Sequence, residues 1–183
     1  NLATDRATIE GSVDTALLIK AVADAGYEAR VVAAGSPDAA AVARKEAETV
    51  GLKRDLTVAA LLSAPIVVLE MGSHLVPAIH ELIMQTIGMQ RNWYLQFALT
   101  TLVLFVPGRR FYTKGLPALA RFAPDMSSLV AVGTLAAYLH SLVATFAPQI
   151  LPPGTVNVYY EAAAVIVTLI LLGRFLEARA KGR

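Results

Sequence analysis

Four apolar segments in residues 55–183 constrain most strongly what this chain can fold into. They are Leu56–Val76, Trp93–Pro107, Met126–Phe146 and Val158–Leu176. Three of them are 19 to 21 residues long, and an α-helix needs about 20 apolar residues to cross a bilayer. The shorter second segment needs neighbouring residues or a locally thinner bilayer to cross. The pattern predicts a mainly α-helical membrane protein with four transmembrane helices.

The composition agrees with a membrane protein and argues against several other classes. Hydrophobic residues make up 56% of the 183 residues and the mean hydropathy is +0.56, more than an ordinary soluble domain needs. The basic residues lie in loops, so the net charge of +2 gives no case for a nucleic-acid partner. The absence of cysteine excludes disulfides and thiolate metal sites from this chain. Because it starts without Met or a signal pattern and ends on a basic run, we interpret it as an internal piece.

Basic residues beside the apolar segments predict the topology, because basic loops stay in the cytoplasm. They precede the first segment, lie between the second and third, and follow the fourth, whereas the other two loops contain only Arg91. Both ends of the chain are therefore expected to be cytoplasmic. This topology puts Met126 and Glu177 at the cytoplasmic face and Glu70 and Glu161 toward the outer face.

The first 54 residues predict two further parts. Thr8–Gly11 and Tyr27–Ala33 have strand character, and Val13–Ala25 has apolar residues at helical spacing. Residues 1–34 therefore look like half of a small α/β unit. An Ala-rich, charged helix in residues 35–54 predicts a linker or juxtamembrane helix.

Four residues near the ends of the segments have side chains suited to a soft metal ion. A thioether at Met126 beside a carboxylate at Glu177 would suit copper(I), which prefers soft ligands. Carboxylates at Glu70 and Glu161 would form a looser, releasing set. Simpler interpretations are that Met126 packs, that Glu177 pairs with a basic neighbour in solvent, and that Glu161 is hydrated at the interface.

A proline and a glycine end the second apolar segment. Pro107 removes a backbone donor and Gly108 tolerates an open backbone, so we expect a kink at the cytoplasmic interface. Residues 109–122 alternate basic and apolar side chains at helical spacing, which predicts an amphipathic helix on the membrane surface. This platform is interpreted as a docking surface for an acidic soluble partner, or else as a loop that contacts lipid phosphates; its residues are Gly108, Arg109, Arg110 and Lys114.

Several motifs occur in a fixed order along the chain: Leu69-Glu-Met-Gly-Ser-His74, Pro107-Gly108, Asp125-Met126, Tyr160-Glu-Ala-Ala-Ala164 and Gly173-Arg-Phe-Leu-Glu177. Together they resemble one family, the bacterial copper(I)-exporting P-type ATPases. Residues 1–33 are similar to the second half of a heavy-metal-associated domain of ferredoxin-like fold. The resemblance implies the N-terminal membrane part of a metal-translocating ATPase in a bacterial inner membrane.

The resemblance also implies roles for single residues. Met126 and Glu177 match the family's cytoplasmic loading positions for copper(I), and Glu70 and Glu161 match acids of its outward release path. The kinked second helix and its basic continuation match the platform at which a copper chaperone, or the protein's own metal-binding domain, delivers metal. Relatives often have a pair of glycines at the kink, and here Pro107 replaces one. Mg²⁺ and ATP would bind in domains that this chain does not contain, so it has no catalytic residues of its own.

Two other functions fit parts of the pattern. One is a non-enzymatic scaffold or channel-like module with four membrane spans. The other is a zinc or cadmium exporter of the same superfamily, although the thioether of Met126 favours copper over harder divalent ions.

Overall fold

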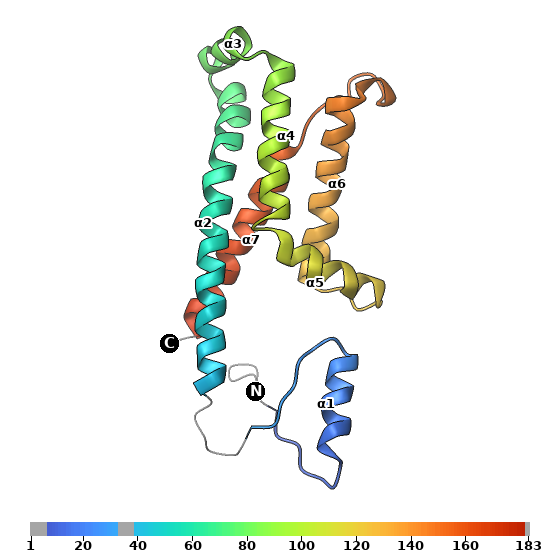
Figure 1. Ribbon diagram of the computed structural model, residues 1–183. Coiled ribbons are helices and arrows are strands. Elements are labelled where there is room, and N and C mark those ends of the chain that lie inside the picture. The colour runs from blue at the N-terminus through green and yellow to red at the C-terminus, as the bar shows by residue number, and fades with distance from the viewer. Residues whose placement is uncertain (1–6, 33–38, 182–183) are drawn as a thin grey trace.

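The computed structural model describes residues 7–32 and 39–181, and within these ranges the chain is helical (Figure 1). The mainly α-helical fold expected from the sequence is confirmed. The elements are α1 (Thr15–Asp24), α2 (Ala39–Leu75), α3 (Pro77–Thr86), α4 (Met89–Phe105), α5 (Arg109–Ala120), α6 (Met126–Phe146), the 3₁₀ turn η1 (Pro148–Ile150) and α7 (Tyr160–Lys181).

Helix α1 forms as expected, but the strands predicted on either side of it do not. Asp14 caps the helix by accepting a hydrogen bond from the Ala16 amide at 3.0 Å, and Gly26 with φ +88° follows its end. Residues 7–10 and 27–32 contain no strand, and Ala33 lies outside the described residues. Because two short segments that do not pair cannot form a stable sheet, the partial ferredoxin-like unit is not supported.

Helix α2 joins two segments that the sequence separates. Its 37 residues correspond to about 55 Å at 1.5 Å per residue, longer than a bilayer core of about 30 Å. The charged first part and the apolar part after Asp55 form one continuous helix, with Pro65 inside it. The linker helix and the first apolar segment therefore share one axis.

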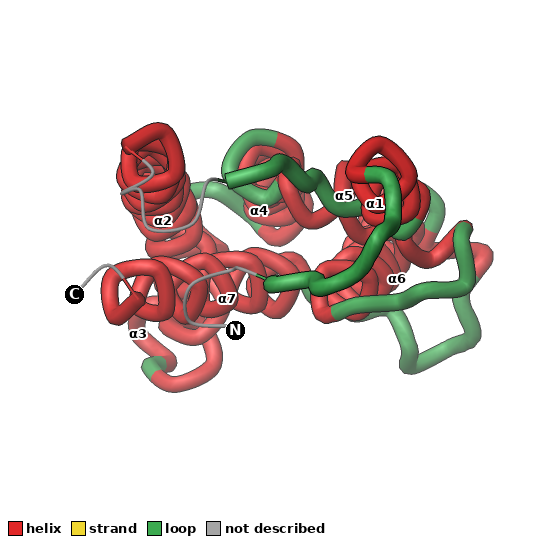
Figure 2. Tube along the Cα trace, turned by 90° about the horizontal axis from the view of Figure 1, so that it is seen from below, coloured by secondary structure: helices red, strands yellow, loops and turns green. Residues whose placement is uncertain are grey.

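Four long helices make up the main body, and α7 packs against the other three (Figures 1 and 2). The beginning of α2 and the end of α7 lie at the same end of the body in Figure 1. Small side chains allow α2 and α7 to approach closely, as is common between membrane helices. Ala59 and Ala164 are fully buried, and Ser63 Oγ lies 2.9 Å from Thr168 Oγ1 across this interface.

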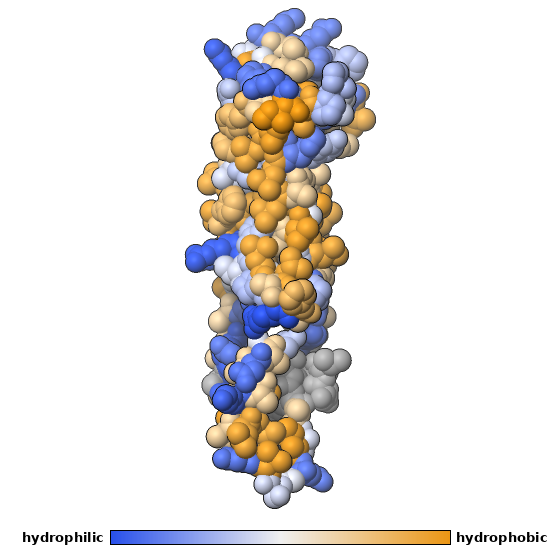
Figure 3. Space-filling view, turned by 90° about the vertical axis from the view of Figure 1, so that its right-hand side faces the viewer, coloured by the Kyte–Doolittle hydropathy of each residue, from blue (hydrophilic) through white to orange (hydrophobic). Residues whose placement is uncertain are grey.

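The outer surface of the body is apolar. Leu61, Val68, Leu129 and Leu169 are each more than half exposed. Figure 3 shows such side chains gathered between polar groups at the top of the view and a charged band below. Because a soluble monomer rarely exposes a continuous apolar surface of this kind, the fold is that of a membrane protein.

Two helices of the described chain are long and apolar enough to cross a membrane, and the sequence predicted four. They are Ala41–Leu75 within α2 and Met126–Phe146, which is α6. Helix α4 has only 17 residues. Helix α7 has Glu161 in its first turn and Arg174 and Glu177 near its end, so charged side chains limit its apolar stretch. Length and composition therefore do not support four spans.

Two glycines position α5 below α4 and α6. The chain turns at residues 106–108, where the Gly108 amide donates to the Val103 carbonyl at 3.0 Å. A Cβ on Gly108 would lie 2.6 Å from the Leu104 carbonyl oxygen, and one on Gly115 would lie closer still to the Ser127 carbonyl oxygen. Glycine at these positions lets α5 turn away from α4 and contact the start of α6.

Candidate functional site

A polar cluster lies among α2, α4 and α7 at the α3 end of the body. The Glu70 carboxylate is its centre, with a side chain 19% exposed. One oxygen of Glu70 lies 3.1 Å from His74 Nε2 one helical turn away, and the other accepts a hydrogen bond from Gln96 Nε2 at 2.9 Å. The acid is thus held from both sides, by its own helix and by α4.

Glu161 joins this cluster from the first turn of α7. Its carboxylate interacts electrostatically with Glu70 and His74, and its Oε2 is buried without a hydrogen-bond partner. The structure therefore brings the two predicted release acids together, on two helices that pack against each other. A buried carboxylate oxygen without a donor is costly, so this position favours a proton, a water molecule or a cation beside it.

The sequence analysis missed Gln96 and Asn92, which lie one turn apart on α4. Gln96 is fully buried and Asn92 is 7% exposed. The carbonyl oxygen of each side chain is buried without a hydrogen-bond partner. Thr100 continues the same face and its hydroxyl donates to the Tyr160 carbonyl at 3.4 Å. The repeat of polar residues at positions 92, 96 and 100 in an apolar segment was the signal that could have identified them.

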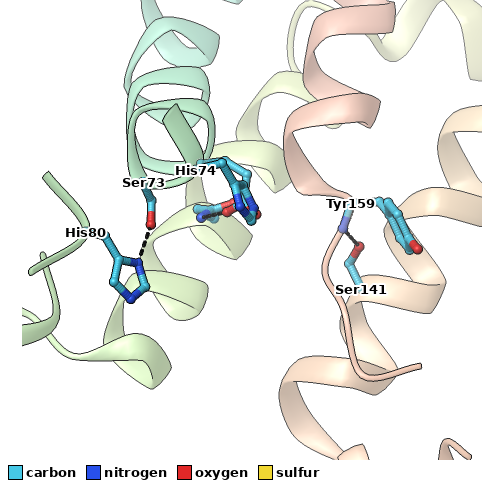
Figure 4. Close-up of polar contacts among 7 residues, drawn as sticks. Ser73, His74, His80, Ser141 and Tyr159 are labelled. Atoms are coloured by element: carbon cyan, nitrogen blue, oxygen red, sulfur yellow. Dashed lines mark hydrogen bonds and ion pairs between the residues drawn. The ribbon is translucent and has the colours of Figure 1, made fainter. Parts of the chain in front are cut away.

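Other polar contacts surround the cluster but involve different partners (Figure 4). Ser73 Oγ lies 2.8 Å from His80 Nδ1 and links α2 to α3. The Tyr159 amide donates to Ser141 Oγ at 2.6 Å and fixes the start of α7 against α6. The His140 ring lies 5.3 Å from the Tyr159 ring, so its nearest aromatic contact belongs to this second pair.

The predicted loading residues lie at the opposite end of the body. Met126 is the first residue of α6 and is 46% exposed. Glu177 lies in the last two turns of α7, is exposed, and accepts a hydrogen bond from Lys181 at 2.8 Å. Arg174 Nη2 donates to Ser127 Oγ at 3.3 Å and so joins α7 to the residue after Met126. The two helix ends are neighbours, while Glu177 itself pairs with its own helix.

The pKa of the Glu177 carboxyl lies below its usual value. The hydrogen bond from Lys181 is the main cause, followed by the positive charge of the same side chain. A carboxyl of this kind stays ionised to lower pH than a free one, with Lys181 as its partner.

Some side chains of the predicted platform helix are paired or buried against other helices, and others are exposed. Arg110 forms an ion pair with Asp55 of α2, whereas Arg109 is exposed and lies toward the outside of the α4–α5 turn. Lys114 is also exposed. Tyr112 is buried against α6, where its hydroxyl lies 2.7 Å from Thr134 Oγ1, and burial raises the pKa of this phenol. Only part of the predicted basic surface is therefore open to a partner.

Neither end of the body holds a complete metal site in the described part of the chain. No three side chains of the types His, Asp and Glu gather closely enough there to bind one ion. Glu70 with Glu161, and Met126 with Glu177, each supply two ligand groups at most. Either set would need further ligands to bind an ion.

The fold and the polar side chains at its two ends define a class: a helical membrane domain with polar and charged groups at both ends of its helices. Comparison with known proteins agrees with this class. The chain is 57% identical, over its whole length, to copper-transporting ATPase 1 of Rhizobium meliloti, and 36% identical to a copper-exporting P-type ATPase of Bacillus subtilis. It is also 40% identical, over 66% of its length, to a silver exporting P-type ATPase of Salmonella typhimurium.

The chain therefore belongs to the P-type ATPase family, within its metal-transporting members. It spans 22% of the length of the Rhizobium and Bacillus relatives and 15% of the Salmonella one, so it corresponds to a part of such a protein. No protein-family model matches it.

Proposed function

We propose that the chain is the N-terminal membrane part of an ATP-driven copper(I) exporter of a bacterial inner membrane. The observation that carries the proposal is the separation of two partial ligand sets at opposite ends of one helical body. Met126 and Glu177 would receive the ion, and Glu70 and Glu161 would help to release it. The relatives' names as copper-transporting ATPases support copper as the cargo.

In this proposal α2, α4, α6 and α7 each cross the bilayer, with both ends of the chain in the cytoplasm. Helix α4 corresponds to about 26 Å at 1.5 Å per residue, a few ångströms less than a bilayer core, and local thinning makes up such a difference. The acids of α7 lie in its first turn and in its last two turns, and Arg174 can extend along the helix toward the interface. The charges of α7 are thus compatible with a span.

At the cytoplasmic end, the chemistry favours a soft monovalent ion. The Met126 thioether is half exposed at a helix start, where an arriving ion can reach it. The ionised carboxylate of Glu177, on the neighbouring helix α7, adds a negative charge. The thioether is the soft ligand of the pair and favours copper(I), whereas the carboxylate is a hard ligand that adds negative charge. Further ligands would come from helices outside this chain.

At the outer end, Gln96 keeps Glu70 in place. The Gln96 amide donates to one carboxylate oxygen of Glu70, and His74 contacts the other. Both oxygens of the carboxylate thus already have a protein partner. A carboxylate bound in this way is a weaker ligand than a free one, which suits release. We therefore assign Gln96 a positioning role beside the two acids.

Delivery would take place at the platform, through a copper chaperone or the protein's own metal-binding domain. Residues 35–54 and 55–183 would then be the connecting helix and the membrane part. Exposed Arg109 and Lys114 supply the positive charge that an acidic carrier would recognise. ATP and Mg²⁺ would bind to the parts of the protein beyond this chain.

The test is a double substitution, Met126→Ala with Glu177→Ala, in the full-length protein. Copper-stimulated ATPase activity should fall strongly, because both loading ligands of this chain are lost. A matched control is Met84→Ala with Glu81→Ala on α3, which removes an exposed Met and Glu at the other end of the body. Unchanged activity in the first variant, or an equal loss in the second, would refute the loading role.

Silver(I) is a second candidate cargo. One relative is named a silver exporter, and silver(I) shares the preference of copper(I) for soft ligands. Measuring ATPase stimulation by each ion in the same preparation separates the two. A response to zinc alone would instead favour the divalent alternative.

A further inference from the structure

A small pocket lies where α2, α5, α6 and α7 meet, on the side of the body that carries Met126. Three basic side chains line it: Arg110 and Lys114 from α5, and Arg174 from α7. Ser127 and Glu48 complete its polar lining. Residues far apart in the sequence thus converge on one basic site. This site differs from the predicted platform, because Arg174 belongs to α7 and not to the platform helix.

Two hydrogen-bond donors of this pocket have no acceptor. The Nε atoms of Arg110 and Arg174 are buried without a partner. Each guanidinium is anchored through another nitrogen, Arg110 to Asp55 and Arg174 to Ser127. Buried donors in native proteins are nearly always paired. Both arginines line the pocket, so each keeps a donor that an acceptor bound there could satisfy.

The charge of the pocket favours an anion. Of the acids nearby, Glu48 is exposed at the rim, and Asp55 contacts Arg110 from outside the pocket. Glu177 also interacts with Arg174 but is paired with Lys181. With Glu48, Asp55 and this pair all counted, four cations face three carboxylates, which leaves one positive charge in excess. Guanidinium groups bind phosphate through parallel N–H···O bonds, and the several oxygens of a phosphate group can accept from two arginines and a lysine together.

We propose that this pocket binds a phosphate group, supplied either by the headgroup of an anionic phospholipid or by free inorganic phosphate. The lipid source rests on the proposed function, because that topology puts α5 at the level of the cytoplasmic headgroups. A bound phosphate would tie the end of α7 to α5 directly beside Ser127. The loading residues Met126 and Glu177 would then be held by a ligand as well as by protein contacts.

The experiment uses the full-length protein, freed of lipid in a neutral detergent and without copper. Native mass spectrometry then counts bound phosphatidylglycerol against phosphatidylcholine. Arg174→Gln and, separately, Lys114→Gln should weaken phosphatidylglycerol binding about tenfold, because each loses a charge-assisted contact. Arg109→Gln is the matched control, since it removes an equal charge from the same helix but outside this pocket.

A second arm identifies the source of the phosphate. Sodium phosphate is added at constant ionic strength, with sodium chloride as the reference. Retention of phosphatidylglycerol in phosphate supports the lipid, whereas its displacement, or binding of phosphate alone, supports the free ion. The proposal is overturned if neither ligand binds, if Arg174→Gln binds like the unmodified protein, or if Arg109→Gln loses as much as Arg174→Gln.

Folding of the variants is checked by thermal unfolding without ligand. Arg174→Lys provides a further variant that keeps the charge and loses the planar fork, so it should bind with intermediate affinity. Because copper and ATP are absent from these measurements, failure of the phosphate site leaves the proposed export function unaffected. Loss of copper-stimulated activity in the loading variants is likewise independent of lipid binding.

Discussion

Replacing Gly115 by alanine tests whether the platform helix really packs on the start of α6. A Cβ at this position would lie 2.5 Å from the Ser127 carbonyl carbon and 2.7 Å from the Ser128 amide nitrogen. These are backbone atoms, so relief requires α5 to move away from α6. The movement would also lengthen the 2.7 Å hydrogen bond from Ser128 Oγ to the Gly115 carbonyl.

The expected magnitude follows from three effects. Overpacking costs about 1–3 kcal/mol, and the hydrogen bond contributes about 1 kcal/mol. Alanine gains up to about 1 kcal/mol over glycine within a helix. The free energy of unfolding should therefore fall by about 1–3 kcal/mol for Gly115→Ala. Gly133→Ala is the control, because nothing lies within 4 Å of a Cβ at that position of α6, so this variant should be neutral or slightly more stable.

The assay is thermal unfolding of the two full-length variants in one detergent, followed by copper-stimulated ATPase activity. Gly115→Ala should unfold at a lower temperature than Gly133→Ala and should have lower activity at limiting copper, because Ser127 follows Met126 directly. Equal stability of the two variants would refute the close packing of α5 on α6. A stability loss with normal copper dependence would show that the contact does not position the loading end.

Two further predictions concern the acids. Gln96→Leu removes the donor to Glu70 and the unpaired amide oxygen. The rates of metal release and dephosphorylation should therefore fall by more than the rate of metal loading. An equal fall in the release and loading rates would contradict the positioning role. Lys181→Met removes the main cause of the lowered pKa of Glu177. Without Lys181 the carboxyl is protonated at a higher pH, so the variant should lose copper loading at a higher pH than the unmodified protein. An unchanged pH profile of copper loading would contradict this reasoning.

The sequence predicted the elements whose signals are local. Met126–Phe146 matches α6 at both ends, because Asp125 and Ser128 form a capping box that marks its start and an apolar run fills the rest. The turn before α5 was likewise marked by Pro107 and Gly108. The predicted platform, 109–122, extends two residues beyond α5.

Features that depend on distances between helices were not predictable. Gln96 looks like any polar residue in an apolar segment until α2 brings Glu70 against it. Gly115 carries no special backbone angle, and its role comes from the approach of α6. The predicted strands failed for a similar reason, since a strand requires a neighbour to pair with. The charged residues before Leu56 suggested a boundary, but they lie on the exposed part of one continuous helix and do not interrupt it.

In the proposed function, the geometry of α7 requires the two predicted ligand sets to act separately. Glu161 and Glu177 are 16 residues apart, which at about 100° per residue places them roughly 160° apart around the helix. The structure agrees, because Glu161 interacts with Glu70 and His74 whereas Glu177 is exposed and pairs with Lys181. An ion that followed one face of α7 would meet only one of the two acids. In that proposal, transfer between them would require ligands from other helices, which an isolated four-helix channel would lack and a longer translocating protein would supply.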